Sequence, residues 1–281
     1  MKGRFLSEKL IEEFGNYLVL EEKSDHTVQK YMRDVRTFAA YSEQNEISKE
    51  LAIDYKQHLQ DSGYAVRSIN SMLASLNSLF DWLGWYDCRV KALKTQKQIF
   101  CPEEKELSKA EYLRLVNTAK QKGNERLNLI LQTICGTGIR VSELEFITVE
   151  SARCGEAIVS CKGKTRSVFL VKELQKKLLR YCAKQGIISG RIFITRTGKP
   201  ISRTNIWREM KALCEQASVD PRKVFPHNLR HLFARVFYDL EKDIAKLADI
   251  LGHSSINTTR IYIISTGIEH RRRMESMRLI V

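Results

Sequence analysis

Apolar residues recur at helical spacing through residues 1–92, and no β-prone run interrupts them. The first stretch carries Leu10, Ile11, Phe14, Tyr17 and Leu18. Three further stretches repeat this spacing, over residues 28–38, 51–59 and 69–83. Amphipathic helices in water bury their apolar stripes against one another. The sequence therefore predicts a domain of four helices over residues 1–92.

A polar segment over residues 93–106 separates this domain from the rest of the chain. It mixes charges, contains Pro102 and lacks apolar periodicity, which is typical of a linker. A second domain over residues 107–281 begins at Ser108, where Glu111 three residues later completes a capping box. Most of this domain again shows helical spacing.

One β-prone region interrupts the second domain. Residues 157–161 and 166–170 are short strand-forming runs joined by Lys162, Gly163, Lys164 and Thr165, which predicts a β-hairpin. A further short strand is expected over residues 191–195. The predicted fold class is therefore mainly α with a small β-hairpin, in two domains.

The net charge indicates a polyanionic partner. The chain carries +14 over 281 residues, with a pI near 9.5. Residues 1–100 hold as many acidic as basic residues, so the whole excess lies in residues 101–281. An excess confined to one region favours nucleic acid over a uniformly solvated surface.

The cysteines and the hydropathy indicate the cellular setting. The 7 cysteines form no C-x-x-C pair, so neither a disulfide framework nor a zinc ribbon is expected. No secretory signal and no membrane-spanning run is recognised. We expect a protein of the reducing cytoplasm, without a membrane partner.

The segment from Phe225 to Tyr262 holds an unusual set of polar side chains. In a helix that opens near Pro226, the side chains of His227, Arg230 and His231 would share one face, where a core helix would carry apolar residues. Gly252 is typical of a helix end, and His253 follows it. No adjacent acid completes a metal site.

Two further segments add cationic side chains. Arg140 and Glu143 follow a glycine-rich break at residues 136–138 and could be an ordinary surface ion pair, but the break would let a ligand approach Arg140 closely. Lys162 and Lys164 in the hairpin turn are either solvated or able to reach a bound phosphate.

Together these residues suit chemistry at a phosphodiester. Two arginines can hold the nonbridging oxygens and stabilise a pentacoordinate transition state without a metal or other cofactor. A tyrosine hydroxyl is a plausible nucleophile, and a positioned lysine can protonate the leaving 5′ oxygen.

The ordered motifs resemble those of the tyrosine recombinases of the phage integrase family, over essentially the whole chain. The matching segments are Thr137-Gly138-Ile139-Arg140-Val141-Ser142-Glu143-Leu144, Lys162-Gly163-Lys164-Thr165-Arg166, His227-Asn228-Leu229-Arg230-His231, Leu251-Gly252-His253 and Tyr262. One departure concerns the hairpin turn, where a single residue, Gly163, separates the two lysines, whereas the family usually has two.

The resemblance implies a role for each matched residue. Arg140 and Arg230 would hold the scissile phosphate, and Tyr262 would form a 3′-phosphotyrosine. Lys162 would be the general acid, with Lys164 as the alternative that the short turn leaves open. The remaining roles are acid/base exchange for His227, a bond to a phosphate oxygen for His253, and support from Glu143 and His231.

The resemblance also implies an architecture and partners. A core-binding domain and a catalytic domain would form a C-shaped clamp on double-stranded DNA at specific core sites, in an Xer-like layout without an arm-binding domain. A homotetramer would form in the synaptic complex, with a monomer as one option in solution, and the tail after Tyr262 would pack in trans. An accessory directionality factor and a location on the bacterial nucleoid would be typical.

Three other classes of protein fit the sequence less well. His227 and His231 have the spacing of a zinc hydrolase motif, but Asn228 replaces the general base and Arg230 would repel the cation. A non-catalytic DNA-binding regulator would not need every polar position filled. A type IB topoisomerase shares the chemistry, but the small helical domain favours recombination. Integration and excision of a mobile element is the preferred role, with Xer-type dimer resolution or DNA inversion as alternatives.

Overall fold

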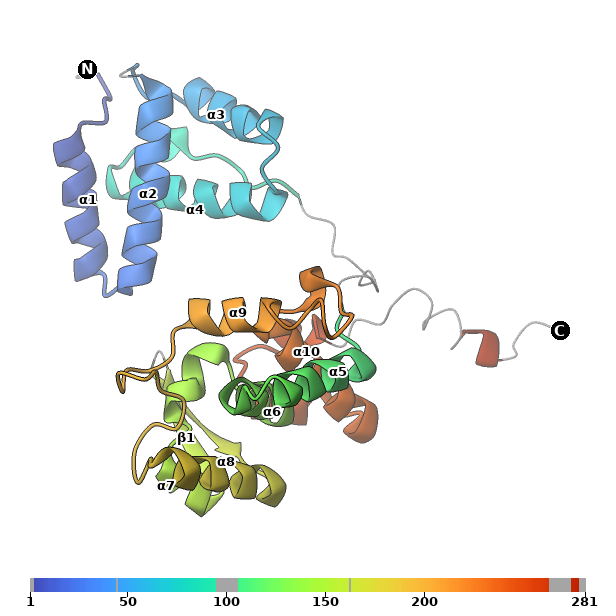
Figure 1. Cartoon of the computed structure of the whole chain (residues 1–281). Helices are drawn as coiled ribbons and strands as arrows, with labels where there is room; N and C mark the ends of the chain where they lie inside the picture. The colour runs from blue at the N-terminus through green and yellow to red at the C-terminus, as the bar shows by residue number, and fades with distance from the viewer. Residues whose placement is uncertain (1–2, 44, 95–105, 162, 263–273, 278–281) are drawn as a thin grey trace. The chain divides into compact units, whose positions relative to one another are not determined.

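The computed structural model describes residues 3–43, 45–94, 106–161, 163–262 and 274–277. The chain divides into two compact units, residues 1–97 and 98–281, and each is considered by itself (Figure 1). Most of the expected linker, the predicted general acid Lys162 and most of the tail after Tyr262 lie outside the described residues.

The amino-terminal unit consists of four α-helices and one short 3₁₀ turn, which confirms the predicted helical domain. The elements are α1 (Glu8–Leu20), α2 (Asp25–Ser42), α3 (Lys49–Asp61), α4 (Val66–Trp82) and η1 (Tyr86–Cys88). The side chains of Ser7 and Ser48 accept hydrogen bonds from the backbone amides of Leu10 and Leu51. Each serine thereby satisfies an amide that has no partner within the first turn of its helix. Helix α2 begins at Asp25 with Ser24 as its N-cap, which is earlier than the apolar run from residue 28 indicated.

Aromatic rings hold the centre of this unit together. Phe38 on α2 meets Tyr55 on α3 at 5.0 Å and Phe80 on α4 at 6.0 Å between ring centroids, both edge to face. All three side chains are buried. Each such pair stabilises by about 1 kcal/mol beyond its buried area, so three helices share one tightly packed point.

The second unit is built around a central helix. Its elements are α5 (Lys109–Gln121), α6 (Glu125–Thr137), η3 (Val141–Phe146), α7 (Val149–Cys154), β1 (Glu156–Cys161), β2 (Lys164–Phe169), α8 (Lys172–Gln185), α9 (Arg203–Lys211), η4 (Pro221–Lys223), α10 (Pro226–Glu241), α11 (Ile244–Leu251) and α12 (Ile256–Arg260). Helix α6 packs against α5, α8, α9 and α10. It is apolar on most of its surface, which is why it occupies the middle of the unit.

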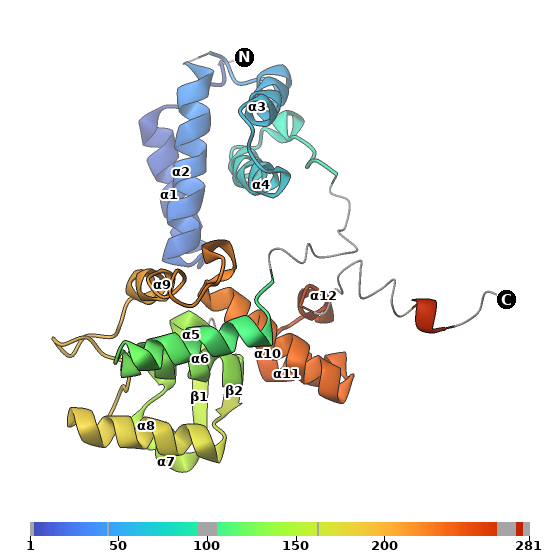
Figure 2. The same ribbon diagram turned by 45° about the vertical axis from the view of Figure 1, so that its right-hand side comes forward.

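The predicted β-hairpin is confirmed. Strands β1 and β2 pair antiparallel with Ala157 opposite Val168 and Val159 opposite Arg166, and these residues face the core. Ile158 and Phe169 lie on the outer face and are exposed. Figure 2 shows the hairpin running between α6 and the pair α7 and α8, with α11 beside β2.

The strand expected over residues 191–195 is wrong. Arg191 forms only an isolated bridge with Thr148, and Ile194 forms one with Pro200. The two bridges join this segment to different partners, so no continuous ladder forms along it.

None of the helices in the described part of the chain combines the length and the apolar character that a bilayer-spanning helix needs.

Candidate active site

Arg140 is fixed by the buried carboxylate of Glu143. The Arg140 amide donates to Glu143 Oε2 at 2.9 Å, and its guanidinium donates to Oε1 at 2.8 Å. Arg166 on β2 donates to Oε2 at 2.6 Å. Burial opposes ionisation of Glu143, but these hydrogen bonds and the two positive charges outweigh it and hold the pKa of the carboxyl below its usual range. Arg140 itself stays 38% exposed and can face a ligand.

Arg230 lies on α10 and is 2% exposed. Its guanidinium donates to the carbonyl oxygen of Gly138, to that of Leu251 at 2.8 Å, and to Nε2 of His253 at 2.9 Å, while its Nε has no partner. Burial and the charge of Arg140 lower the pKa of Arg230 to about 10, against the opposing effect of the Tyr262 phenol. A buried cation held beside another cation favours an anionic ligand between them.

A glycine makes the contact with Arg230 possible. Gly138 has φ +66° and is the C-cap of α6, at the last residue of the expected glycine-rich break. A Cβ at this position would lie 2.5 Å from the Phe233 ring. No other residue would therefore present its carbonyl to Arg230 at this place without displacing Phe233.

His253 has a fixed tautomer. Arginine can only donate, so Nε2 of His253 accepts from Arg230, and Nδ1 carries the proton that it donates to Thr259 Oγ1 at 2.9 Å. Burial, followed by the charges of Arg230 and Arg140, lowers the pKa of His253 to about 4. The ring is therefore neutral at physiological pH.

Tyr262 is surrounded by imidazoles. Its ring centroid lies 5.4 Å from His227, 5.2 Å from His231 and 5.4 Å from His253, and the side chain is 5% exposed. Nε2 of His231 donates to the Ile261 carbonyl at 3.4 Å, which ties α10 to the segment that carries Tyr262.

The other two imidazoles are also biased towards the neutral form. Partial withdrawal from water and then the charges of Arg230 and Arg140 lower the pKa of His227. Burial lowers the pKa of His231, against its hydrogen bond to Ile261. Neutral rings beside a phenol can accept its proton.

Three of the predicted site residues line an open cleft of about 570 Å³. Its lining includes Arg140, His227 and Arg230 from the predicted set, together with Arg203, Thr204 and Trp207 from α9. Arg140 and Arg166 share the carboxylate of Glu143, whereas Arg230 donates to two backbone carbonyls and to His253, so positive charge exceeds negative charge around the cleft. Such a cleft attracts a phosphate group.

The structure thus brings together seven of the nine predicted site residues: Arg140, Glu143, His227, Arg230, His231, His253 and Tyr262. Lys162 lies outside the described residues, and of Lys164 only the backbone in β2 is described. Within the described part of the chain, no three His, Cys, Asp or Glu residues could hold a metal ion together.

Sequence reasoning assigned no role to three contributors, Arg166, Thr259 and Arg203. Arg166 binds Glu143, and Thr259 fixes the tautomer of His253. Arg203 lines the cleft and adds to the field at His227. Arg166 gave one signal, an arginine on the same strand face as the buried Val168. Thr259 gave none, because a buried threonine is a common core residue.

Comparisons with known proteins cover both units. The model described as phage integrase family matches residues 105–267, and the model described as phage integrase, N-terminal SAM-like domain, matches residues 11–86. A protein of Thermococcus kodakarensis named tyrosine recombinase XerA is 30% identical over 282 residues, which cover 97% of this chain and 96% of that protein. Tyrosine recombinase XerD of Halalkalibacterium halodurans is 26% identical, over 85% of this chain and 87% of its own.

A solved structure shares the fold. A lambda integrase dimer bound to a COC′ core site superposes with a TM-score of 0.73, covering 92% of this chain and 95% of that chain at 16% identity.

Proposed function

Because this chain is a tyrosine recombinase of the phage integrase family, we propose that it cleaves and rejoins specific duplex DNA through a 3′-phosphotyrosine on Tyr262. The observation that carries the proposal is the position of Tyr262. Its phenol lies among three neutral imidazoles and beside the buried Arg230, at a cleft with surplus positive charge. A phosphodiester entering this cleft meets cations and a nucleophile together.

In the proposed cleavage step, Tyr262 Oη attacks the scissile phosphorus, and the bond to the 5′ oxygen breaks. Arg140 and Arg230 hold the nonbridging oxygens and stabilise the added negative charge of the transition state. The phenol proton passes to a neutral imidazole, for which His227 stands at the open edge of the cleft. The 5′ oxygen takes a proton from Lys162, or from Lys164 if the short turn shifts the roles. Attack by a 5′ hydroxyl reverses the step and rejoins the strand.

His253 has to change its hydrogen bonds in order to meet the phosphate. Its Nε2 accepts from Arg230 in the free protein, so it has no proton there to donate. Bonding to a phosphate oxygen therefore requires a proton on Nε2. The negative phosphate supplies the field that makes this protonation favourable. DNA binding and proton uptake at His253 are coupled in this proposal.

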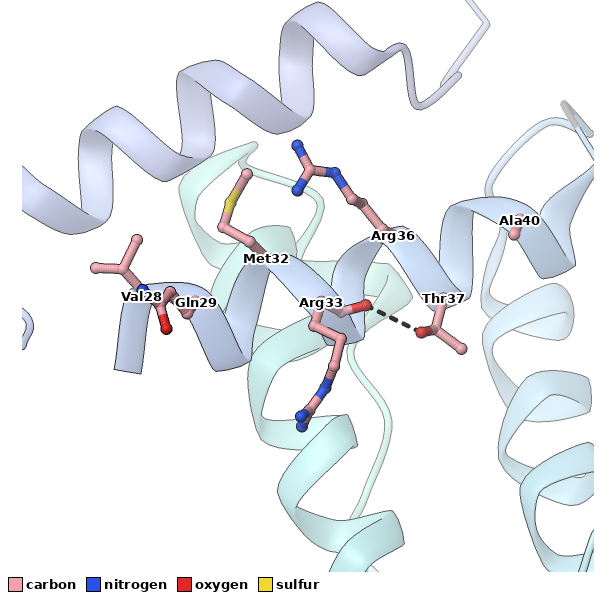
Figure 3. A pocket seen from close by; sticks show the side chains of 7 residues that line it. All are labelled: Val28, Gln29, Met32, Arg33, Arg36, Thr37 and Ala40. Carbon is pink, nitrogen blue, oxygen red and sulfur yellow. Dashed lines mark hydrogen bonds between the residues drawn. The ribbon is translucent and has the colours of Figure 1, made fainter. Parts of the chain in front are cut away.

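The amino-terminal unit offers a second surface for DNA. Seven residues of α2 line a shallow hollow of about 720 Å³, which we call the α2 surface: Val28, Gln29, Met32, Arg33, Arg36, Thr37 and Ala40. Figure 3 shows the side chains of Arg33 and Arg36 projecting from the helix in different directions. Arg33 is 74% exposed and forms an ion pair with the neighbouring Asp34 at 3.3 Å. Exposed guanidiniums beside amide and hydroxyl groups suit contacts to phosphates and base edges.

Several biological roles use this cleavage chemistry. Integration and excision of a mobile element on nucleoid DNA is the role we favour, with four protomers on two core sites and an accessory factor that sets direction. Dimer resolution and DNA inversion use the same cleavage step. The DNA that the protein cleaves distinguishes these roles, since an element's integrase acts at the element's own ends.

The test uses a nicked suicide duplex taken from the DNA that flanks the gene, incubated in EDTA with the wild type, Tyr262→Phe and Tyr238→Phe. Tyr238 packs against the apolar cluster that contains Tyr262 and serves as the matched control. We expect a denaturant-stable adduct with the wild type and with Tyr238→Phe only. An adduct that survives in Tyr262→Phe would identify a different nucleophile, and binding without any adduct would favour a non-catalytic regulator.

A further inference from the structure

Arg166 links three elements of the catalytic unit. It lies on β2 opposite Val159, on the strand face that points to the core, and its side chain is 13% exposed. Its guanidinium donates to Glu143 Oε2 at 2.6 Å and to the Ile250 carbonyl at 2.9 Å. One side chain therefore connects the hairpin, the turn that carries Arg140, and the carboxyl end of α11.

The contact with α11 lies directly before His253. The last carbonyls of a helix lack partners within the helix, and a cation there also faces the negative end of the helix dipole. Arg166 meets both needs at Ile250. Gly252 follows with φ +65°, and a Cβ at that position would lie 2.3 Å from Cδ of Arg166 and 2.7 Å from its Nε. The turn into His253 is thus packed directly on the Arg166 side chain.

We propose that Arg166 is a positioning residue of the recombinase site, which sets the separation between Arg140 and His253. It reaches Arg140 through the shared carboxylate of Glu143 and reaches His253 through the end of α11. Arg166 does not line the cleft, so it acts through these two residues and not on the DNA. This inference rests on the proposed function of the cleft.

The same chain contains an arginine of matching chemistry away from the cleft. Arg126 on α6 donates to Glu209 Oε1 at 2.7 Å and to the Ile194 carbonyl at 3.0 Å. Both arginines also have a buried Nε without a hydrogen-bond partner. Arg126 is not among the residues that line the cleft. It therefore reports what the loss of such an arginine costs in stability alone.

Removing Arg166 has a second, electrostatic consequence. Its charge lowers the pKa of Glu143, which Arg140 also faces, and that of His253, which Arg230, Arg140 and His227 also face. Without Arg166 both pKa values rise. Glu143 must be ionised to hold Arg140. The acid limb of the cleavage rate therefore moves to higher pH in the variant.

The experiment compares Arg166→Ala and Arg166→Lys with Arg126→Ala and Arg126→Lys. For each, the measurements are single-turnover cleavage of the suicide duplex across pH, the Kd for the same duplex, and Tm. We expect Arg166→Ala to cleave about 10–100-fold more slowly than the wild type with a Kd within about threefold, because a displaced catalytic group costs rate and not binding. Arg126→Ala should keep the wild-type rate at a comparable loss of Tm.

Each outcome decides between the explanations. Cleavage by Arg166→Ala at the wild-type rate, or an equal loss of rate in Arg126→Ala, overturns the positioning role. If Arg166→Ala does not fold, Arg166→Lys decides, because one ammonium cannot serve both Glu143 and Ile250 with the geometry of a guanidinium. A slower rate in that variant with a Kd near that of the wild type supports the role, and a wild-type rate removes it. If the wild type forms no adduct, the proposed function itself fails.

Discussion

The two units bury charge in opposite ways. In the amino-terminal unit, the buried Asp34 on α2 receives Lys30 at 2.8 Å and the Ser75 hydroxyl at 3.0 Å, so a carboxylate is matched within the fold. In the catalytic unit, Arg140 and Arg166 share one carboxylate, and the buried Arg230 donates to two backbone carbonyls and an imidazole. Buried charge alone therefore does not identify a functional site. The active site is distinguished by its excess of positive charge, because a fold that leaves cations uncompensated is stabilised when an anion binds there.

The largest expected effect on cleavage comes from removing one of the cations of the catalytic unit. Arg230→Gln removes the buried cation, and we expect single-turnover cleavage to fall by about 10³-fold, because a preorganised charge at the transition state is lost. Arg126→Gln, which removes an arginine of the same unit outside the cleft, should cleave normally. A rate for Arg230→Gln within about tenfold of the wild type would mean that surplus charge does not drive this site.

Removing the matched carboxylate of the amino-terminal unit should lower stability and leave cleavage unchanged. Asp34→Ala leaves Lys30 and Ser75 without their buried acceptor, and we expect the free energy of unfolding of the amino-terminal unit to fall by about 2–4 kcal/mol. Cleavage at saturating DNA should not change. Urea unfolding followed by tryptophan fluorescence measures this unit, since Trp82 and Trp85 both lie in it and Trp207 can be replaced by Phe.

Asp34→Asn is the control, because it keeps the shape and the hydrogen bond to Ser75 and should lose less stability than Asp34→Ala. If both variants cleave more slowly at saturating DNA, the comparison between the units no longer holds.

Local patterns predicted much of the fold, because their causes are local. The caps Ser7, Ser48, Ser108 and Ser202 each bind an amide two or three residues into the helix that follows, and the hairpin follows from two strand-forming runs. Helix α2 begins before its apolar run because the first turn of the helix, from Asp25 to Thr27, is polar. The strand near residue 191 failed because its two bridges lead to separate segments, at Thr148 and Pro200, which no property of the run itself reveals.

The site was predictable as a set of residues but not as a network. The order of the motifs indicated Arg140, His227, Arg230, His253 and Tyr262, whereas the contacts between them join distant positions. Arg230 meets Gly138 across 92 residues, and Arg166 meets Ile250 across 84. Such pairs depend on how the helices pack, and the spacing of residues in a single sequence does not reveal them. The roles of the individual residues in catalysis stay predictions until variants are measured.

In the catalytic unit, His253 should make the free energy of unfolding depend on pH. The pKa of His253 is about 4 in the folded protein and near its ordinary 6.5 in the unfolded chain. Between these values the unfolded chain binds more protons, so stability is fully present above about pH 6.5 and is lost as the pH falls towards 4. From pH 7 to pH 5 we expect His253 to account for a loss of about 1–2 kcal/mol.

Urea unfolding of the wild type and of His253→Gln at both pH values measures this contribution. The wild type should lose more stability on acidification than the variant, because the variant has no imidazole at this position. Equal losses in the two proteins would assign the proton uptake to another group, of which His227 and His231 are the nearest with lowered pKa values.

The smallest expected effect concerns the α2 surface, where the amino-terminal unit has exposed charge and no cleft. If Arg33 contacts a phosphate, Arg33→Ala should weaken duplex binding about equally for all sequences and reduce the slope of log Kd against log salt by about 1. Arg89→Ala is the control, since Arg89 is 53% exposed, lies beside Asp81 and is not part of the α2 surface. A reduced slope in both variants would indicate a diffuse field instead of a defined contact. A loss confined to one DNA sequence would instead make Arg33 a base-reading residue, and the helical unit would then share the choice of the site that the catalytic unit cleaves.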